Sequence, residues 1–266
     1  MSVSRTSQAV ALTRAGFTRP HSRTGDPDAQ RKLCAGMPPV TLPALVASLA
    51  ARTQFVDQQV ISAIGAGVRQ IVVLGAGYDD RALRFATPGV VFYEVDHPAT
   101  QADKRARLAA IDAGEQADDQ ARRAGPVFAQ ADFRLDEVGQ ALARVGHDPG
   151  LDTLFLAEGL LVYLDQPVTI KLLGGARAVA TSASVLAASL SVHDAGLDTA
   201  AVLARANARR RAAAQEPWLT ILPASAQREL LARAGWQVTG LVDAADFGTG
   251  AEPGRSLLVT AQPASE

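Results

Sequence analysis

The residues best suited to binding a ligand in this sequence of 266 residues are a Gly-x-Gly turn and an acid that follows it. Residues 71–74 form a short continuous apolar run, typical of a buried parallel strand, and lead into Gly75-Ala76-Gly77. Glycine lets the backbone turn tightly and come close to a ligand. The next apolar run ends in Asp96, 19 positions after Gly77, where an acid can accept hydrogen bonds from both hydroxyls of a ribose. Together these features predict a site for a cofactor that contains adenosine.

The two acids after the turn, Asp79 and Asp80, bear on which cofactor this is. A dinucleotide-binding fingerprint has a third small glycine at position 80. Two carboxylates suit the dipole of a helix N-terminus, but they would repel a pyrophosphate bound there. S-adenosylmethionine has no phosphate, and its amino group and sulfonium are cationic, so the local charge favours it over NAD. The alternative is that the two acids only cap the helix that follows.

Two further acids follow strand-like apolar runs. Asp132 comes after residues 127–131, where a carboxylate can accept a hydrogen bond from the adenine amino group while Phe133 packs on the ring; an Asp there is also a common helix cap. Glu158 comes after residues 151–157, and open α/β sheets bind ligands at the carboxyl ends of their strands. A buried carboxylate needs a cationic or donor partner, which the cofactor's sulfonium and amino group could supply.

The elements that would position these residues are strands alternating with helices. The apolar pattern predicts strands at 71–74, 90–96, 127–131, 151–157, 184–192, 236–242 and 256–261. Helices are expected at 7–17, 28–35, 44–66, 99–113, 135–146, 165–181, 197–214 and 224–234. This alternation favours an α/β fold with a Rossmann-like, doubly wound, mostly parallel seven-stranded sheet. A loop alone separates the last two strands, so we expect them to form an antiparallel hairpin at the sheet's edge.

The chain is expected to be one domain over residues 1–266. Residues 1–66 would form an N-terminal helical arm or cap, in which the proline-rich stretch 18–43 is irregular. Residues 67–266 would form the Rossmann-like core, with a helical insertion near 193–222. Within the insertion, the basic stretch 205–213 predicts a solvated helix face, or else a surface that grips an anionic substrate.

Composition and charge exclude several classes of partner. The net charge of −1 provides no field for nucleic acid or an anionic membrane. Cys34 is the only cysteine and the four histidines are scattered, so we expect no metal site. No apolar run reaches the roughly 20 residues of a membrane span, and the first residues lack the apolar core of a secretory signal. The sequence therefore predicts a cytoplasmic protein.

Several blocks of this sequence resemble the leucine carboxyl methyltransferase family, above all its bacterial branch of carboxyl and O-methyltransferases acting on small molecules and natural products. The similarity runs from about residue 10 to the final strand. The matching blocks are Arg14-Ala15, Asp26-Pro27, Ala51-Arg52-Thr53 followed by Asp57, residues 74–81, Tyr93-Glu94-Val95-Asp96-His97-Pro98 followed by Lys104, and residues 158–164.

The resemblance implies S-adenosylmethionine as the cofactor and gives roles to individual residues. It implies that Arg14 and Arg52 hold the cofactor's methionine carboxylate and that Gly75 contacts the cofactor. By the same resemblance, Asp96 binds the ribose, Asp132 and Phe133 contact the adenine, and Glu158 lies beside the methionine part. The chain departs from the family at Asp79-Asp80-Arg81, where the family usually has Asp-Thr-Arg, and this adds a charge near the amino end of the cofactor.

The expected activity is methyl transfer to a carboxylate of a small molecule or natural-product intermediate, as in secondary metabolism. A carboxylate is ionised at neutral pH and needs no general base, so catalysis would come from holding the reacting atoms in line with water excluded. A hydroxyl acceptor would need a base, and His97 and His193 are the candidates. Tyr163 would line the acceptor pocket or pack in the core. Other hypotheses are a hydroxyl-directed O-methyltransferase, a nucleotide-dependent oxidoreductase and a non-catalytic protein that binds S-adenosylmethionine.

Overall fold

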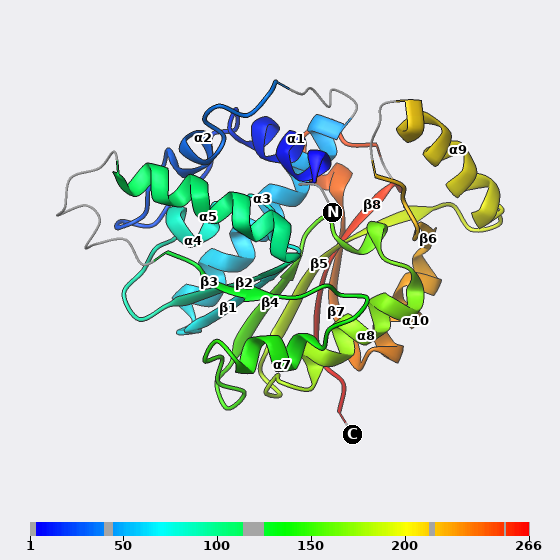
Figure 1. Cartoon of the computed structure of the whole chain (residues 1–266). Coiled ribbons are helices and arrows are strands. Elements are labelled where there is room, and N and C mark those ends of the chain that lie inside the picture. The colour runs from blue at the N-terminus through cyan, green and yellow to red at the C-terminus, as the bar shows by residue number, and fades with distance from the viewer. Residues whose placement is uncertain (1–3, 40–44, 114–124, 213–215, 253, 266) are drawn as a thin grey trace.

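A central sheet with helices on both faces forms the core of the chain (Figure 1). The computed structural model describes residues 4–39, 45–113, 125–212, 216–252 and 254–265. The main strand order is β3-β2-β1-β4-β5-β8-β7. These strands are β1 (Gln70–Leu74), β2 (Val91–Asp96), β3 (Val127–Gln130), β4 (Thr153–Ala157), β5 (Val185–His193), β7 (Trp236–Asp243) and β8 (Ser256–Pro263). The doubly wound α/β fold expected from the sequence is confirmed, and each predicted strand is present.

The direction of chain winding reverses between β1 and β4. Strands β1 to β5 pair in parallel, with β2 and β3 on one side of β1 and β4 and β5 on the other. The predicted hairpin is also confirmed: β8 runs antiparallel to both β5 and β7, and β7 lies at the edge. One strand was not predicted. The two-residue β6 (Leu222–Pro223) pairs with the end of β5, and so short a segment has no periodicity to detect.

Alternate side chains of the strands build two apolar clusters, one on each face of the sheet. On one face, Phe155 and Trp236 pack with α7 (Val138–Ala143), α8 (Gln166–Arg177) and α10 (Ala224–Arg233). On the other face, Ile71 and Phe92 pack with Phe55 of α3 (Val46–Gly65). Helix α3, grouped with the N-terminal arm by the sequence analysis, thus covers the sheet as part of the core. Because both faces are covered, β1 and β4 are buried throughout, which explains their continuous apolar sequences.

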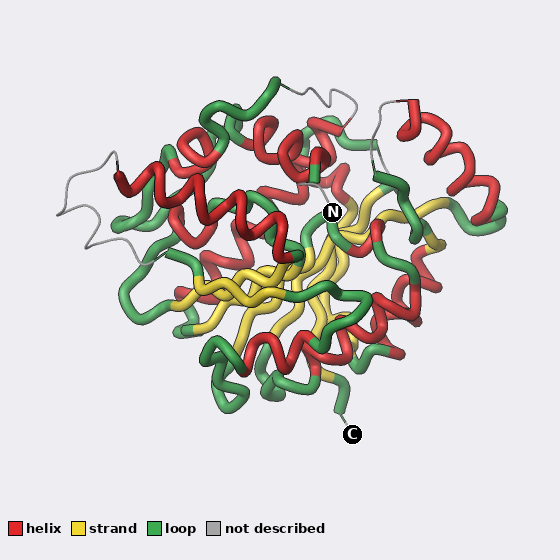
Figure 2. Tube along the Cα trace, in the orientation of Figure 1, coloured by secondary structure: helices red, strands yellow, loops and turns green. Residues whose placement is uncertain are grey.

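The remaining N-terminal elements lie on the same side of the sheet as α3 (Figures 1 and 2). These are α1 (Arg5–Arg14), α2 (Ala29–Leu33), the four-residue α4 (Arg81–Arg84) and α5 (Pro98–Ala113). The irregular arm between α1 and α2 is tied to α4, since the backbone N–H groups of Ser22 and Asp26 donate to the carbonyls of Arg84 and Leu83. The part of the predicted arm at residues 40–43, and residue 44 of the next predicted helix, lie outside the described residues.

The predicted insertion contains α9 (Thr199–Ala212), which Figure 1 shows at the margin of the molecule beyond the end of β5. Arg205 and Arg209 are exposed there, whereas Arg210 is buried. Residues 213–215 of the insertion, including the end of the basic stretch, lie outside the described residues. Within the described parts of the chain, no helix is long and apolar enough to cross a membrane, and no cluster of His, Cys, Asp and Glu suits a metal ion.

Candidate active site

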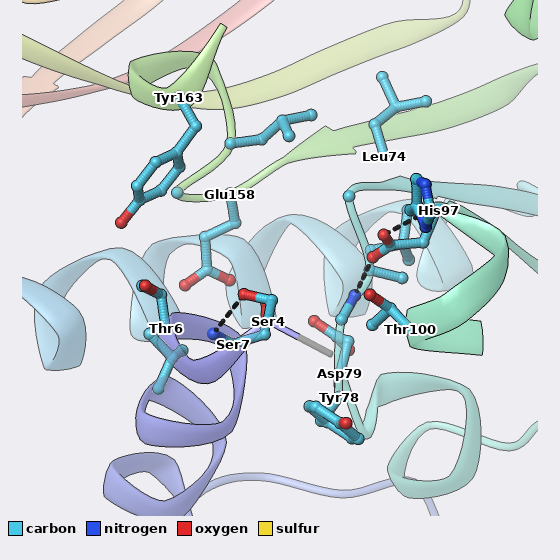
Figure 3. Close-up of a pocket in the computed structure, with 18 of the residues that line it drawn as sticks. Ser4, Thr6, Ser7, Leu74, Tyr78, Asp79, His97, Thr100, Glu158 and Tyr163 are labelled. Carbon is cyan, nitrogen blue, oxygen red and sulfur yellow. Dashed lines mark hydrogen bonds between the residues drawn. The ribbon is translucent and has the colours of Figure 1, made fainter. Parts of the chain in front are cut away.

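A pocket of about 290 Å³ opens at the carboxyl ends of β1, β2 and β4. Its walls come from the loops after these strands, from α1 and from the short 3₁₀ helix Leu161–Tyr163. The structure brings all of the predicted cofactor residues to this pocket, namely Arg14, Arg52, Gly75, Gly77, Asp79, Asp96, Asp132, Phe133 and Glu158. Figure 3 shows Thr6, Glu158 and Tyr163 on one side of it and His97 and Thr100 on the other.

The glycine turn needs both of its glycines. Gly75 and Gly77 adopt φ values of +64° and +52°, a left-handed conformation that costs other residues energy. A Cβ atom on Gly75 would lie 2.7 Å from Leu160 Cδ1, and one on Gly77 would lie 3.1 Å from the side chain of Ser7. Helix α1 and the segment after β4 therefore pack directly on the turn, which forms the floor of the pocket.

Asp96 is held by the backbone on both sides. One carboxylate oxygen accepts the N–H of Gly77, and the other accepts the N–H of His97 at 2.6 Å. Burial raises the pKa of Asp96, and these two donors act against that shift. Because a carboxylate has about four lone-pair positions, acceptor capacity remains for a ligand in the pocket. This is the arrangement that a pair of vicinal hydroxyls requires.

Glu158 lies among three arginines at the other end of the pocket. Its side chain is 3% exposed, and it forms an ion pair with Arg14. Arg52 Nε lies 3.2 Å from Oε1, and a terminal nitrogen of Arg81 lies 2.9 Å from Oε2. Burial favours the protonated acid, but the three guanidinium groups outweigh it and hold the pKa of Glu158 far below its usual value. The cation beside Glu158, expected from the cofactor, is thus supplied by the protein's own arginines.

Asp79 and Asp80 point to different places. Asp79 lines the pocket, accepts the N–H of Arg81 at 2.8 Å and pairs with that guanidinium at 2.5 Å. Asp80 is fully buried away from the pocket, where Arg19 binds both of its oxygens, at 3.0 and 2.5 Å, and Arg84 Nε lies 3.1 Å away. Burial opposes ionisation, yet Arg84 and Arg19 lower the pKa of Asp80.

Two expectations about these acids are therefore wrong. Asp80 adds no charge near the cofactor's amino end, because it is part of a buried ion-pair network. The charge argument against a pyrophosphate also fails, because arginines neutralise both carboxylates. A different feature disfavours a dinucleotide: α4, which follows the glycine turn, has only four residues. So short a helix offers little of the N-terminal dipole that a Rossmann site turns toward phosphate.

Asp132 lies at the pocket and also caps a turn. It lines the pocket with Phe133, and its Oδ1 accepts the N–H of Arg134 at 3.0 Å, so it also caps the turn after β3. No contact shown by the structure tests its adenine role, so the adenine contact stays a prediction.

Of the catalytic candidates, Tyr163 and His97 line the pocket. His97 Nδ1 accepts the N–H of Ala99 at 3.2 Å, a local contact at the start of α5. His193 is absent from the described lining. Its ring nitrogens instead lie 2.9 Å from the Asp194 carbonyl oxygen and 2.9 Å from the Thr199 hydroxyl. Its position at the end of β5, outside the pocket, gives no support to a role as a base.

Three residues that build the charged end of the site were not predicted from the sequence. Arg81 is fully buried, and its Nε lies 2.7 Å from Asp57 Oδ1. Thr53 Oγ1 accepts from Arg14 Nε at 3.2 Å. All three stand in blocks that match the family, so the signal was present, but an isolated Thr, Asp or Arg on a helix has no recognisable spacing. Thr6 was also missed; it lines the pocket, and its buried Oγ1 has no partner among the described residues.

Comparisons with known proteins identify the family and the relatives of the chain. The profile of the leucine carboxyl methyltransferase family matches residues 7–176. A protein of Mycobacterium avium is 36% identical over 150 residues, which is 56% of this chain and 47% of that protein. One of Streptomyces avermitilis is 42% identical over 138 residues, 52% of this chain and 45% of that protein. Both are named "putative S-adenosyl-L-methionine-dependent methyltransferase". The chain spans about half the length of the curated relatives it matches.

Solved structures share the fold. A "putative methyltransferase" of Thermobifida fusca superposes with a TM-score of 0.61 at 18% identity, covering 99% of this chain and 96% of that one. Magnesium protoporphyrin IX methyltransferase of Synechocystis, crystallised with S-adenosylhomocysteine, gives a TM-score of 0.55 at 14% identity over 89% and 94% of the two chains. The cofactor predicted from the glycine turn and Asp96 is thus the cofactor named for the relatives. Since the family profile covers most of the chain, the chain belongs to the leucine carboxyl methyltransferase family.

Proposed function

We propose that this chain is an S-adenosylmethionine-dependent O-methyltransferase that methylates a carboxylate of a small molecule or natural-product intermediate. One observation carries the proposal. A single pocket has Asp96, a ribose-type acceptor, on one side of the glycine turn and the arginine cluster around Glu158 on the other. S-adenosylmethionine has the same polarity along its length, with hydroxyls in the middle and an amino acid at one end.

The residues present fit this cofactor. Asp96 has free acceptor capacity for the two ribose hydroxyls, and the turn at Gly75 leaves no side chain between the backbone and the ligand. Arg14 and Arg52 both line the pocket and would hold the methionine carboxylate. The unpartnered hydroxyl of Thr6, buried on the same side, offers one more polar contact there. When bound, S-adenosylmethionine supplies a methyl group on a cationic sulfur.

The protein's part in the reaction is then positioning. A carboxylate acceptor is already a nucleophile at neutral pH, so no side chain has to remove a proton. Tyr163, with Leu160 and Leu164, would form the wall against which the acceptor lies. These residues would exclude water and hold the acceptor oxygen in line with the methyl group, at about 3 Å.

The first test is calorimetric titration of the purified chain with S-adenosylmethionine, together with Asp96→Asn and a control, Asp152→Asn. Asp152 is exposed at the opposite end of β4, where it accepts a hydrogen bond from Thr181. We expect binding by the wild type and the control and a loss of about 10–100-fold in Asp96→Asn, since charge-assisted hydrogen bonds contribute about 1.5–3 kcal/mol. A wild type that fails to bind at millimolar cofactor would overturn the proposal.

A second assay addresses the acceptor. The protein is incubated with methyl-labelled S-adenosylmethionine and with benzoate, cinnamate, octanoate and the organic-acid fraction of a bacterial culture. Methyl esters release labelled methanol in base, whereas methyl ethers do not. Base-labile label supports a carboxylate acceptor, and base-stable label alone would move the assignment to a hydroxyl-directed enzyme. Cofactor binding with no transfer to any of these acceptors would favour a non-catalytic binding protein.

A further inference from the structure

A buried arginine in the helical insertion pairs with no carboxylate of the described residues. Arg210 lies on α9 and is 5% exposed. Its Nε donates to the backbone carbonyl of Glu216, and a terminal nitrogen donates to the hydroxyl oxygen of Tyr163 at 3.2 Å. Among the residues that the structure describes, none brings a carboxylate into ion-pair distance of this guanidinium. A buried charge without a counter-ion is costly, so a negative charge bound close to this guanidinium would stabilise it.

Two aromatic rings hold the guanidinium in place. Its central carbon lies 4.6 Å from the ring centre of Trp218 and 5.3 Å from that of Tyr163. Stacking of this kind is typical of arginine and fixes the plane of its donor fork. The indole N–H of Trp218 is buried and also has no partner among the described residues. Arg210 and Trp218 therefore keep donor hydrogens that no described residue accepts.

Tyr163 connects this arginine to the pocket. It lines the pocket, and Figure 3 shows it on the same side as Glu158 and Thr6, away from His97. Because its oxygen accepts a hydrogen bond from Arg210, its own O–H proton is free to be donated elsewhere. Glu216, whose carbonyl accepts from Arg210, lines the same pocket. The cation thus lies directly behind the wall assigned to the acceptor.

We propose that Arg210 and Tyr163 form the subsite that recognises the carboxylate of the methyl acceptor. The inference rests on the proposed function and implies that the protein selects a negatively charged acceptor. Arg210 is absent from the described lining and acts through Tyr163, whose oxygen it holds from behind the pocket wall. Tyr163 would donate its O–H to a carboxylate oxygen, and the positive charge of Arg210 would favour an anion at this wall. Arg210 is therefore the positioning residue of the pair.

The loss of charge on methylation also favours release of the product from this subsite. A carboxylate oxygen forms a bond to the methyl carbon, the sulfur–methyl bond breaks, and its electron pair stays on sulfur. The negative acceptor and the positive sulfonium become a neutral ester and a neutral thioether. The ester no longer has the charge that Arg210 recognises, so the subsite binds the acceptor more tightly than the product.

The test compares Arg210→Gln and Arg210→Lys with Arg209→Gln, an exposed arginine one position earlier on the same helix. Methyl transfer to benzoate, cinnamate, octanoate and the organic-acid fraction is measured as base-labile label, and S-adenosylmethionine affinity is measured by calorimetry. We expect Arg210→Gln to raise the acceptor KM by about 10–100-fold with the cofactor Kd unchanged. Arg210→Lys, which keeps the charge but loses the fork, should fall between Gln and wild type. Arg209→Gln should behave as wild type.

Tyr163→Phe guards against misfolding of the arginine variants, because it removes only a hydroxyl. We expect it to raise the acceptor KM by about 5–10-fold, as loss of one hydrogen bond would. An unchanged acceptor KM in both Arg210→Gln and Tyr163→Phe would overturn the inference while leaving the proposed function standing. A wild type that binds the cofactor but labels no acid would overturn the inference together with the carboxylate assignment. A wild type without cofactor affinity would overturn the proposed function itself.

Discussion

Replacing Glu158 with glutamine would remove a negative charge that three guanidinium groups share. The substitution conserves shape, so packing around the site stays and the charge alone is lost. Arg14, Arg52 and Arg81 all contact this carboxylate, whose side chain is 3% exposed. Since so little water reaches the pairs, solvent screens them poorly, and the variant leaves positive charges facing one another in a buried space.

The size of the effect follows from the burial and from the partners that remain. Removing one member of a buried ion pair costs about 3–5 kcal/mol. The lower end applies here, because Asp57 and Asp79 still pair with Arg81 and the new amide oxygen can accept one hydrogen bond. A loss of about 3 kcal/mol lowers Tm by about 6–12 °C in a chain of this size.

Scanning calorimetry and urea unfolding at pH 7 would measure the change. The matched control is Glu137→Gln, because Glu137 forms an ion pair with Lys171 at 3.3 Å but is 50% exposed. Exposed pairs contribute at most about 1 kcal/mol, so the control should unfold almost as the wild type does. If Glu158→Gln is as stable as Glu137→Gln, the arginine cluster does not stabilise the fold as we argue.

Acid titration gives a second, independent signature of the same cluster. The pKa of Glu158 is lowered in the folded protein by its arginine partners, against a usual value of 4.5. The carboxylate therefore stabilises the fold above that value, and its contribution is lost as the pH falls below it and the unfolded chain takes up the proton first. The difference in unfolding free energy between the wild type and Glu158→Gln should have its largest value at pH 7 and should decrease as the pH falls below about 4.5. A difference that does not change with pH would contradict an ionised, paired Glu158.

Two further substitutions test the turn and its network. Gly75→Ala should cost about 2–3 kcal/mol and weaken cofactor binding, because Gly75 combines a φ of +64° with a close approach to Leu160; Gly67→Ala, at a φ of +93° with open space around it, should cost only about 1 kcal/mol. Equal losses of stability in the two variants would show that the contact with Leu160 does not matter. Asp80→Thr, which restores the family's usual residue, should lower stability by about 3 kcal/mol because Arg19 loses this carboxylate and Arg84 keeps only Asp57, yet leave the calorimetric affinity for S-adenosylmethionine unchanged. Weaker cofactor binding in that variant would place Asp80 in the site after all.

The sheet could be predicted from the sequence because its strands are buried on both faces. A continuous apolar run such as residues 153–157 is typical of a central strand of a sheet. Helical stretches between such strands predict parallel connections. The packing of α3 and the presence of β6 could not be predicted in this way. Helix α3 precedes the first strand along the chain, so the order of elements alone suggested an arm, whereas its apolar stripe with Phe55 packs on the sheet. Residues 222–223 are too few to form a pattern.

The positions of the site residues were predictable, but their partners were not. Glycines at a strand end and an acid at a fixed spacing are set by the local chain path, so Gly75 and Asp96 could be placed in the pocket. Ion pairs join residues far apart in sequence, and position alone does not say which way a side chain turns. Asp80 illustrates this: one residue away from Asp79, it faces the opposite direction and pairs with Arg19, 61 positions earlier.

The charge balance of the cluster explains how Arg14 and Arg52 can pair with Glu158 and also bind a methionine carboxylate. Connected ion pairs join five arginines to four carboxylates, namely Arg14, Arg19, Arg52, Arg81 and Arg84 with Asp57, Asp79, Asp80 and Glu158. The cluster thus has a surplus of one positive charge. Among these arginines, the described lining of the pocket includes Arg14 and Arg52, so a carboxylate entering the pocket meets the surplus there. Each guanidinium has five donor hydrogens, and pairing with Glu158 uses only part of them. Holding Glu158 therefore prepares Arg14 and Arg52 to bind the methionine carboxylate, because it fixes their orientation without consuming the charge that the carboxylate needs.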